Sequence, residues 1–142
     1  MNLLRMKIYR GLSCNYPMST PTKVIVREAK DALLIEYSDG QAYTLPAEFL
    51  RVYSPSAEVR GHGTGNETLQ FGKRNVTIAS LVKAGNYALQ IVFSDGHDSG
   101  IYSWQYLQEL GETQDSKWSA YLKKIHEAGL SRDLDSQVIK LL

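Results

Sequence analysis

The sequence predicts an α+β domain with an antiparallel sheet, and three observations lead to this class. Short stretches rich in β-branched residues fill the middle of the chain, whereas helical periodicity follows them. Strands and helices do not alternate in the βαβ order typical of a parallel sheet. Residues 32–40 recur at 88–96 with six of nine positions identical. We therefore expect two repeated strand–Asp-Gly–strand–helix units, with a C-terminal amphipathic helix packed on the sheet.

Six stretches are typical of strands, because they are short and are β-branched or alternate between apolar and polar residues. They cover residues 23–28, 32–37, 41–45, 76–82, 88–93 and 101–103. A Ser-Asp-Gly sequence follows the first strand of each repeated unit, which predicts a type I′ turn because Asp-Gly accepts positive φ. Neither hairpin could bury its apolar face alone, so each should pack against the other or against helices.

A short helix is expected after each hairpin. Pro46 suits the first turn of a helix and predicts one that reaches Arg51. Residues 104–107 match that stretch in the second unit, and Gly111 is expected to end the second helix.

The clearest helix lies near the C-terminal end, over residues 116–128. Ser116 is the expected N-cap and Gly129 the expected stop. Its apolar face should cover the sheet and hold Trp118, Tyr121, Leu122 and Ile125. Together with Tyr102, Trp104 and Tyr106, these aromatic residues should lie mostly in the core, and any exposed remainder could bind a partner.

The length of 142 residues suits one folded domain. We expect that domain over residues 18–112, followed by a helical extension over 113–142. Residues 1–17 are expected to form a disordered extension, because basic residues interrupt their apolar ones, and a weak signal peptide is the alternative. Met18 is then a more natural start than Met1.

Composition excludes several classes of function. Sixteen basic and fifteen acidic residues give a net charge of +1, without a basic run that would favour nucleic acid. No apolar stretch approaches the roughly 20 residues of a membrane span. Cys14 is the only cysteine, so an intramolecular disulfide and a cysteine-based structural zinc site are excluded. A cytoplasmic protein without nucleic-acid or membrane partners is expected.

Polar side chains are concentrated between the two units, over residues 50–63. Pro55 and Gly61 predict a loop there, with at most one helical turn that begins at Ser54 and is capped by its hydroxyl. Candidate binding residues are Arg51, Ser54, Ser56, Glu58, Arg60 and His62, with His97 and Asp98 from the second hairpin.

Several strings carry a family resemblance. They are LPAEFLR at 45–51, SPSAEV at 54–59, GNYAL at 85–89 and FSDGHDSGIYSW at 93–104. Together they resemble the gamma-butyrobetaine hydroxylase-like N-terminal domain family over about residues 21–112, and most closely its bacterial stand-alone members. The resemblance implies relatives that precede the oxygenase domain of carnitine-pathway enzymes, and others beside P-loop iron–sulfur carrier ATPases.

The same resemblance bears on a metal. The oxygenase-linked members hold zinc through three cysteines and one histidine, which correspond here to Ser54, Ser56, Val59 and His97. Serine and valine cannot replace thiolate ligands, so the family zinc site is expected to be lost and no cofactor is expected. No histidine has an acidic residue at +2, so the oxygenase chemistry of the longer relatives does not transfer.

His62 and His97 allow two interpretations. The favoured one is a hydrogen-bonded staple, in which His97 joins its hairpin turn to the backbone of the central loop. The alternative is a weak metal site with Asp95 or Asp98 as the third ligand, although no H-x-x-x-H or H-x-H spacing supports it. His126 is expected to be exposed to solvent.

No catalytic constellation emerges from the remaining residues. Asp39 and Asp95 are explained by their turns. The serines at 54, 56 and 99 lie in no Gly-x-Ser-x-Gly elbow. We therefore expect a non-enzymatic accessory or interaction domain that binds another protein, with iron–sulfur carrier machinery as the candidate. The alternative is a weak metal-binding or small-ligand-sensing domain that uses His62 and His97.

Overall fold

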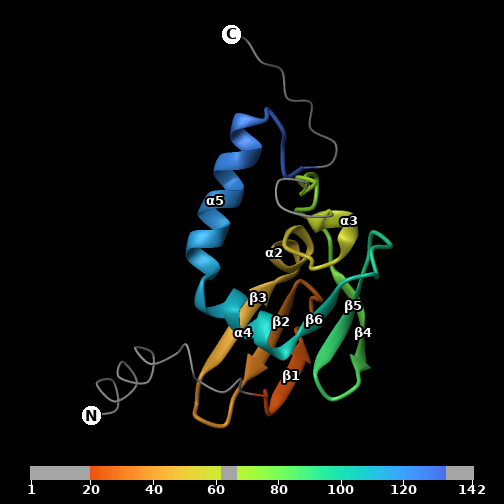
Figure 1. Ribbon diagram of the computed structural model, residues 1–142, viewed down its shortest axis with the longest axis vertical. Coiled ribbons are helices and arrows are strands. Elements are labelled where there is room, and N and C mark those ends of the chain that lie inside the picture. Colours follow the sequence, from red (N-terminus) through yellow and green to blue (C-terminus); the bar gives the residue numbers. More distant parts are fainter. Residues whose placement is uncertain (1–19, 62–66, 134–142) are drawn as a thin grey trace, which may run out of the picture.

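The computed structural model describes residues 20–61 and 67–133, which form two three-stranded antiparallel sheets and four helices (Figure 1). In chain order the elements are β1 (Lys23–Val26), β2 (Ala32–Glu36), β3 (Ala42–Pro46), α2 (Ala47–Val52), α3 (Ala57–Arg60), β4 (Ile78–Ala84), β5 (Ala88–Phe93), β6 (Ile101–Ser103), α4 (Trp104–Glu112) and α5 (Gln114–Glu127). The α+β class is confirmed. The expected N-terminal extension, His62 and residues 134–142 lie outside the described residues.

The strands are divided between two sheets, with the orders β1-β2-β3 and β4-β5-β6, where the sequence suggested one sheet. The chain leaves the first sheet through α2 and α3 before β4 begins. Alternate side chains of both central strands enter one core, among them Leu33 and Ile35 of β2 and Ile91 and Phe93 of β5. Each hairpin therefore buries its apolar face with the help of the other.

Both Asp-Gly turns differ from the predicted type I′ geometry. Only the glycines have positive φ, +90° at Gly40 and +91° at Gly96, whereas a type I′ turn also needs positive φ at the preceding residue. The chain uses a three-residue loop, in which glycine alone must adopt the left-handed conformation. Asp39 and Asp95 each accept the amide two residues further on, at 3.0 and 3.2 Å. The prediction of a type I′ turn is therefore wrong.

Two predicted helix ends are also wrong. Gly111 lies inside α4, where its Cα packs so closely on the Tyr43 ring that a Cβ would collide with it. α5 begins at Gln114 and not after Ser116, whose hydroxyl donates to the Thr113 carbonyl. Gly129 does end α5, with φ of +70°, as predicted.

α5 packs beside α2 along one side of the molecule (Figure 1). Tyr121 and Ile125 are buried with Val52, and Trp118 meets the Phe49 ring edge-on at 6.2 Å. The expected burial of the aromatic residues is confirmed for Tyr102, Trp104 and Tyr121. Within the described ranges, no helix is both long and apolar enough to cross a bilayer.

Candidate functional site

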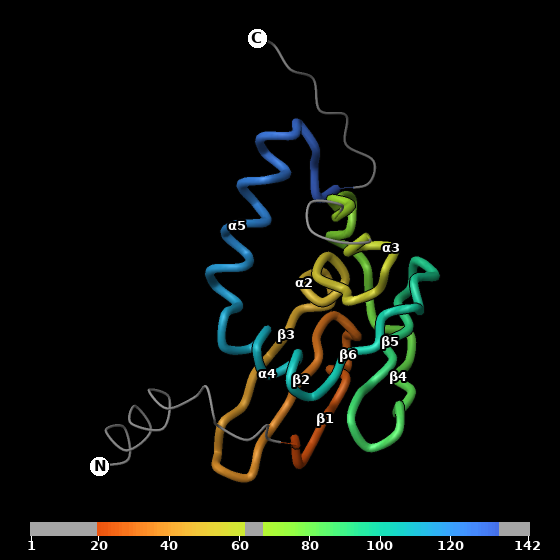
Figure 2. The backbone as a smooth tube through the Cα atoms, in the orientation of Figure 1, coloured from red at the N-terminus to blue at the C-terminus, as the bar shows by residue number. Residues whose placement is uncertain are grey.

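Three side chains join the loop after α2 to the turn between β5 and β6. His97 Nε2 lies 2.9 Å from Ser54 Oγ, and His97 Nδ1 lies 3.1 Å from a carboxylate oxygen of Glu58. The tube in Figure 2 shows α3 beside the turn that carries His97. We call Ser54, Glu58 and His97 the clasp. The predicted staple thus exists, but it uses side chains of the loop and not its backbone.

The proton positions in the clasp follow from its acceptors. The Glu58 carboxylate can only accept, so Nδ1 carries the proton of neutral His97 and Nε2 accepts from the Ser54 hydroxyl. Burial and the nearby Arg51 charge lower the pKa of His97 below its usual 6.5, against the opposing influence of Glu58 and Asp95. The neutral imidazole that this arrangement requires is therefore the favoured form.

The connectivity of the clasp is that of a serine-hydrolase triad, but its nucleophile is closed off. Ser54 is only 1% exposed. A Cβ added at Gly100 would lie 2.5 Å from Ser54 Oγ, so backbone already occupies the space beside the hydroxyl. Nucleophilic attack needs a substrate carbonyl at about 3 Å. The geometry therefore supports a structural role for Ser54.

Ser54 also organises the loop, although not as predicted. Its hydroxyl oxygen accepts from the Ser56 amide at 3.3 Å, so it closes a turn before the helix. α3 itself begins at Ala57, with Ser56 in the N-cap position and no side-chain cap. The predicted cap on a helix beginning at Ser54 is therefore wrong by two residues.

Arg51 and Asp95 form a second link between α2 and the same turn. Arg51 Nε lies 2.9 Å from Asp95, and Lys73 Nζ lies 2.8 Å from the same carboxylate oxygen. Burial alone would raise the pKa of Asp95, but hydrogen bonds from Lys73 and the His97 amide, with the Arg51 charge, lower it to about 2. Asp95 therefore does more than form its turn, which is the role that the sequence predicted for it.

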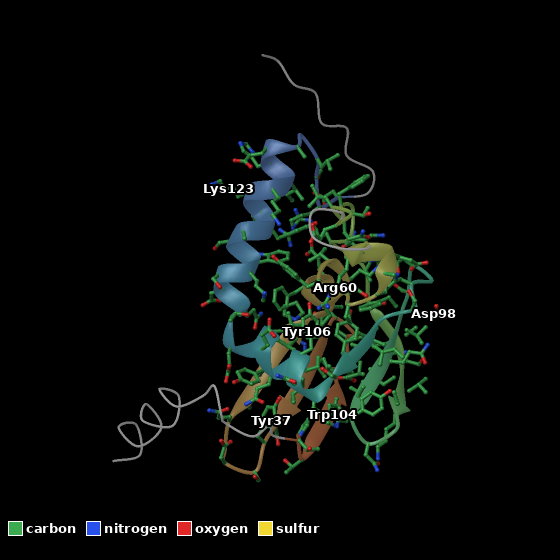
Figure 3. The ribbon with its side chains drawn as sticks, viewed as in Figure 1. Tyr37, Arg60, Asp98, Trp104, Tyr106 and Lys123 are labelled. Atoms are coloured by element: carbon green, nitrogen blue, oxygen red, sulfur yellow. The ribbon has the colours of Figure 1, made fainter. Side chains whose placement is uncertain are left out.

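Within the described part of the chain, the side chains of the other candidate residues Arg60, Ser56 and Asp98 form no hydrogen bond with the clasp side chains, although the Ser56 amide donates to Ser54 Oγ. Arg60 stacks on the Tyr106 ring, with its guanidinium carbon 4.7 Å from the centroid, and both lie near the middle of the view in Figure 3. Asp98 is exposed at the far end of the second hairpin, where its carbonyl accepts from Gln90. Ser56 is buried, and its hydroxyl has no hydrogen-bond partner among the described residues.

A cleft of about 840 Å³ opens on the other side of the loop, between α3 and α5. We call it the α3–α5 cleft; its walls include Val52, Tyr53, Val59, Arg60, Gln70, Tyr106, Tyr121 and Lys124. Its three tyrosine hydroxyls donate to backbone carbonyls, which fixes the rings in place. No local sequence pattern indicates this cleft, because its walls come from segments as far apart in the chain as Val52 and Glu127.

The donor set at the clasp does not fit zinc. Two hydroxyls and a valine stand where thiolates would be needed, and both ring nitrogens of His97 already have protein partners. Within residues 20–61 and 67–133, no three His, Cys, Asp or Glu side chains are grouped to hold a metal ion. The alternative metal site has no support from Asp98, and His62 lies outside the described residues.

These features define a small α+β domain whose central loop is joined to its second hairpin by a polar clasp. The family described as "Gamma-butyrobetaine hydroxylase-like, N-terminal" matches residues 24–108. The chain belongs to that family, as the motifs suggested.

Solved structures are similar to the chain over most of its length. Two NMR solution structures share 48% and 40% identity, with TM-scores of 0.76 and 0.72. They cover 89% and 90% of this chain, and the matches span 99% and 96% of theirs. A crystal structure of a protein of unknown function from Acidithiobacillus ferrooxidans, of the DUF971 family, shares 33% identity with a TM-score of 0.54, over 67% of this chain and 96% of that one. No curated protein matches.

Proposed function

We propose that this protein is a non-catalytic, cytoplasmic accessory domain that binds another protein through the α3–α5 cleft. The observation that carries the proposal is the cleft itself, whose volume of about 840 Å³ lies within the range of preformed binding sites. Its tyrosines and Arg60 belong to the residue types that anchor interfaces.

The charges around the cleft favour a partner with groups of both signs. Three basic and three acidic side chains contribute to its walls, which are Arg60, Lys117, Lys124, Glu67, Glu109 and Glu127. Charged side chains of both signs around a binding site contribute more to the choice of partner than to the strength of binding. A nucleic acid would be poorly matched, because the acidic groups repel phosphates.

The family resemblance supplies the candidate partner class, since some relatives occur beside P-loop iron–sulfur carrier ATPases. The carrier protein of the same organism is thus the first partner to test. Calorimetric titration of the purified carrier into this protein should give saturable binding. Absence of binding with and without nucleotide would overturn this choice of partner.

A charge-reversal pair tests the location of the site. Lys124 lines the cleft, is exposed, and forms no ion pair with another described residue. Lys123 precedes it on α5 and points elsewhere, because successive helical residues are about 100° apart. Lys124→Glu should weaken carrier binding several-fold, whereas Lys123→Glu should not. Equal effects of the two substitutions would exclude the cleft as the binding site.

A further inference from the structure

We infer that the clasp does in this chain what a metal does in the zinc-bearing relatives: it joins the central loop to the second hairpin, by hydrogen bonds with a fixed proton order. The inference concerns a structural device and does not depend on the proposed partner.

Ser54 and His97 occupy two of the four positions at which the resemblance implies metal ligands, and their side chains meet directly at 2.9 Å. Both are buried, with 1% and 7% of their surface exposed. A tetrahedral zinc site would place ligands of this kind around an ion, which leaves no direct hydrogen bond between them. In this protein the side chains at two of those positions, Ser54 and His97, form a hydrogen bond directly with each other.

The central loop and the β5–β6 turn supply the rest of the hydrogen-bond network. Ser56 N–H donates to Ser54 Oγ, the Ser54 hydroxyl donates to His97 Nε2, and His97 Nδ1–H donates to Glu58. Ser99 Oγ also donates to Glu58, at 2.9 Å. Each donor in this hydrogen-bond network has one acceptor. Of the two neutral forms of His97, only the Nδ1–H tautomer allows all of these bonds to form.

Glu58 lies outside the set of positions that the resemblance implies as metal ligands. It projects from α3, one turn after Ser54, and its side chain is 71% exposed. Its carboxylate selects the tautomer that makes Nε2 an acceptor for Ser54. We assign Glu58 as the positioning residue of the clasp.

Nuclear magnetic resonance of the full chain labelled with ¹⁵N in histidine tests this assignment. The His97 ring should show the Nδ1–H tautomer at neutral pH, unchanged by one equivalent of Zn²⁺ or by a chelator. Glu58→Ala removes an exposed group and should fold, yet shift His97 toward the Nε2–H tautomer. An Nε2–H tautomer in the unmodified protein, or a ring that Zn²⁺ shifts stoichiometrically, would overturn the inference.

Thermal unfolding gives an independent readout. His97→Gln should lower Tm by roughly 4–12 °C, since it orphans a buried hydroxyl. His126→Gln is the matched control, because His126 is exposed on α5, and it should leave Tm unchanged. Equal melting of the two variants, or a wild-type Tm that rises with Zn²⁺, would contradict a metal-free clasp.

Discussion

Gly100 and Ser54 are in contact across the two halves of the domain: a Cβ built on Gly100 would fall 2.5 Å from Ser54 Oγ and 3.1 Å from the Tyr102 ring. Because Gly100 has no side chain, the β5–β6 turn can approach the central loop closely. This close approach is what brings His97 within reach of Ser54.

Gly100→Ala should destabilise the fold by about 1–3 kcal/mol, because the added methyl overlaps a buried hydroxyl. Combining it with Ser54→Ala removes that oxygen and should recover part of the loss. Denaturant unfolding of the four proteins in this double-mutant cycle measures the coupling. Strictly additive effects would show that the two residues do not meet in solution.

The stability of the fold should decrease as the pH falls below about 6.5, the ordinary pKa of histidine, and His97 is the reason. Burial, then the Arg51 charge, lower the pKa of folded His97 below 6.5, although Glu58 and Asp95 oppose them. The unfolded chain therefore binds the proton more readily, and the stability from His97 is present above about pH 6.5 and is lost as the pH falls. His97→Gln should flatten the dependence of unfolding free energy on pH in this window, and His126→Gln should retain it.

Asp95→Asn should destabilise the protein more than Asp39→Asn, although both residues occupy the same position in their turns. Asp39 accepts one backbone amide, whereas Asp95 also pairs with Arg51, whose side chain is only 8% exposed. Loss of the Asp95 charge should cost roughly 1–3 kcal/mol. Since the pKa of Asp95 is lowered to about 2, its contribution is present above about pH 3.8 and is lost toward pH 2. Chemical unfolding should show a smaller cost of Asp95→Asn at pH 3 than at pH 7. Equal costs of the substitution at the two pH values would contradict this prediction.

Arg132→Ala should lower stability by about 1–3 kcal/mol, because it leaves the buried Glu48 carboxylate without its partner. The two side chains form a bidentate pair, with distances of 2.7 and 2.8 Å. The exposed pair of Arg27 and Asp31 is the control, and Arg27→Ala should leave the stability almost unchanged because solvent screens this pair. Thermal melting of both variants compares the two pairs.

The order of strands and the core residues of the hairpins could be predicted because they depend on local alternation. The helix limits at Gly111 and Ser116 could not, since the first depends on the approach of Tyr43 from β3 and the second on where α4 ends. The contact between the central loop and His97 could be predicted from the family resemblance. The side chains that bind His97, Ser54 and Glu58, could not. Glu58 and Ser54 reach His97 only because the loop turns at Ser56, which no periodicity encodes.

The family match ends at residue 108, but the contacts that hold the domain together continue beyond it. Trp118 covers Phe49, Arg132 pairs with Glu48, and the Gly72 amide donates to the Ser131 carbonyl. A recombination event that cut the chain at the end of the family match would therefore expose the apolar side of α2. The residues beyond the family match thus complete the packing of α2 in this chain.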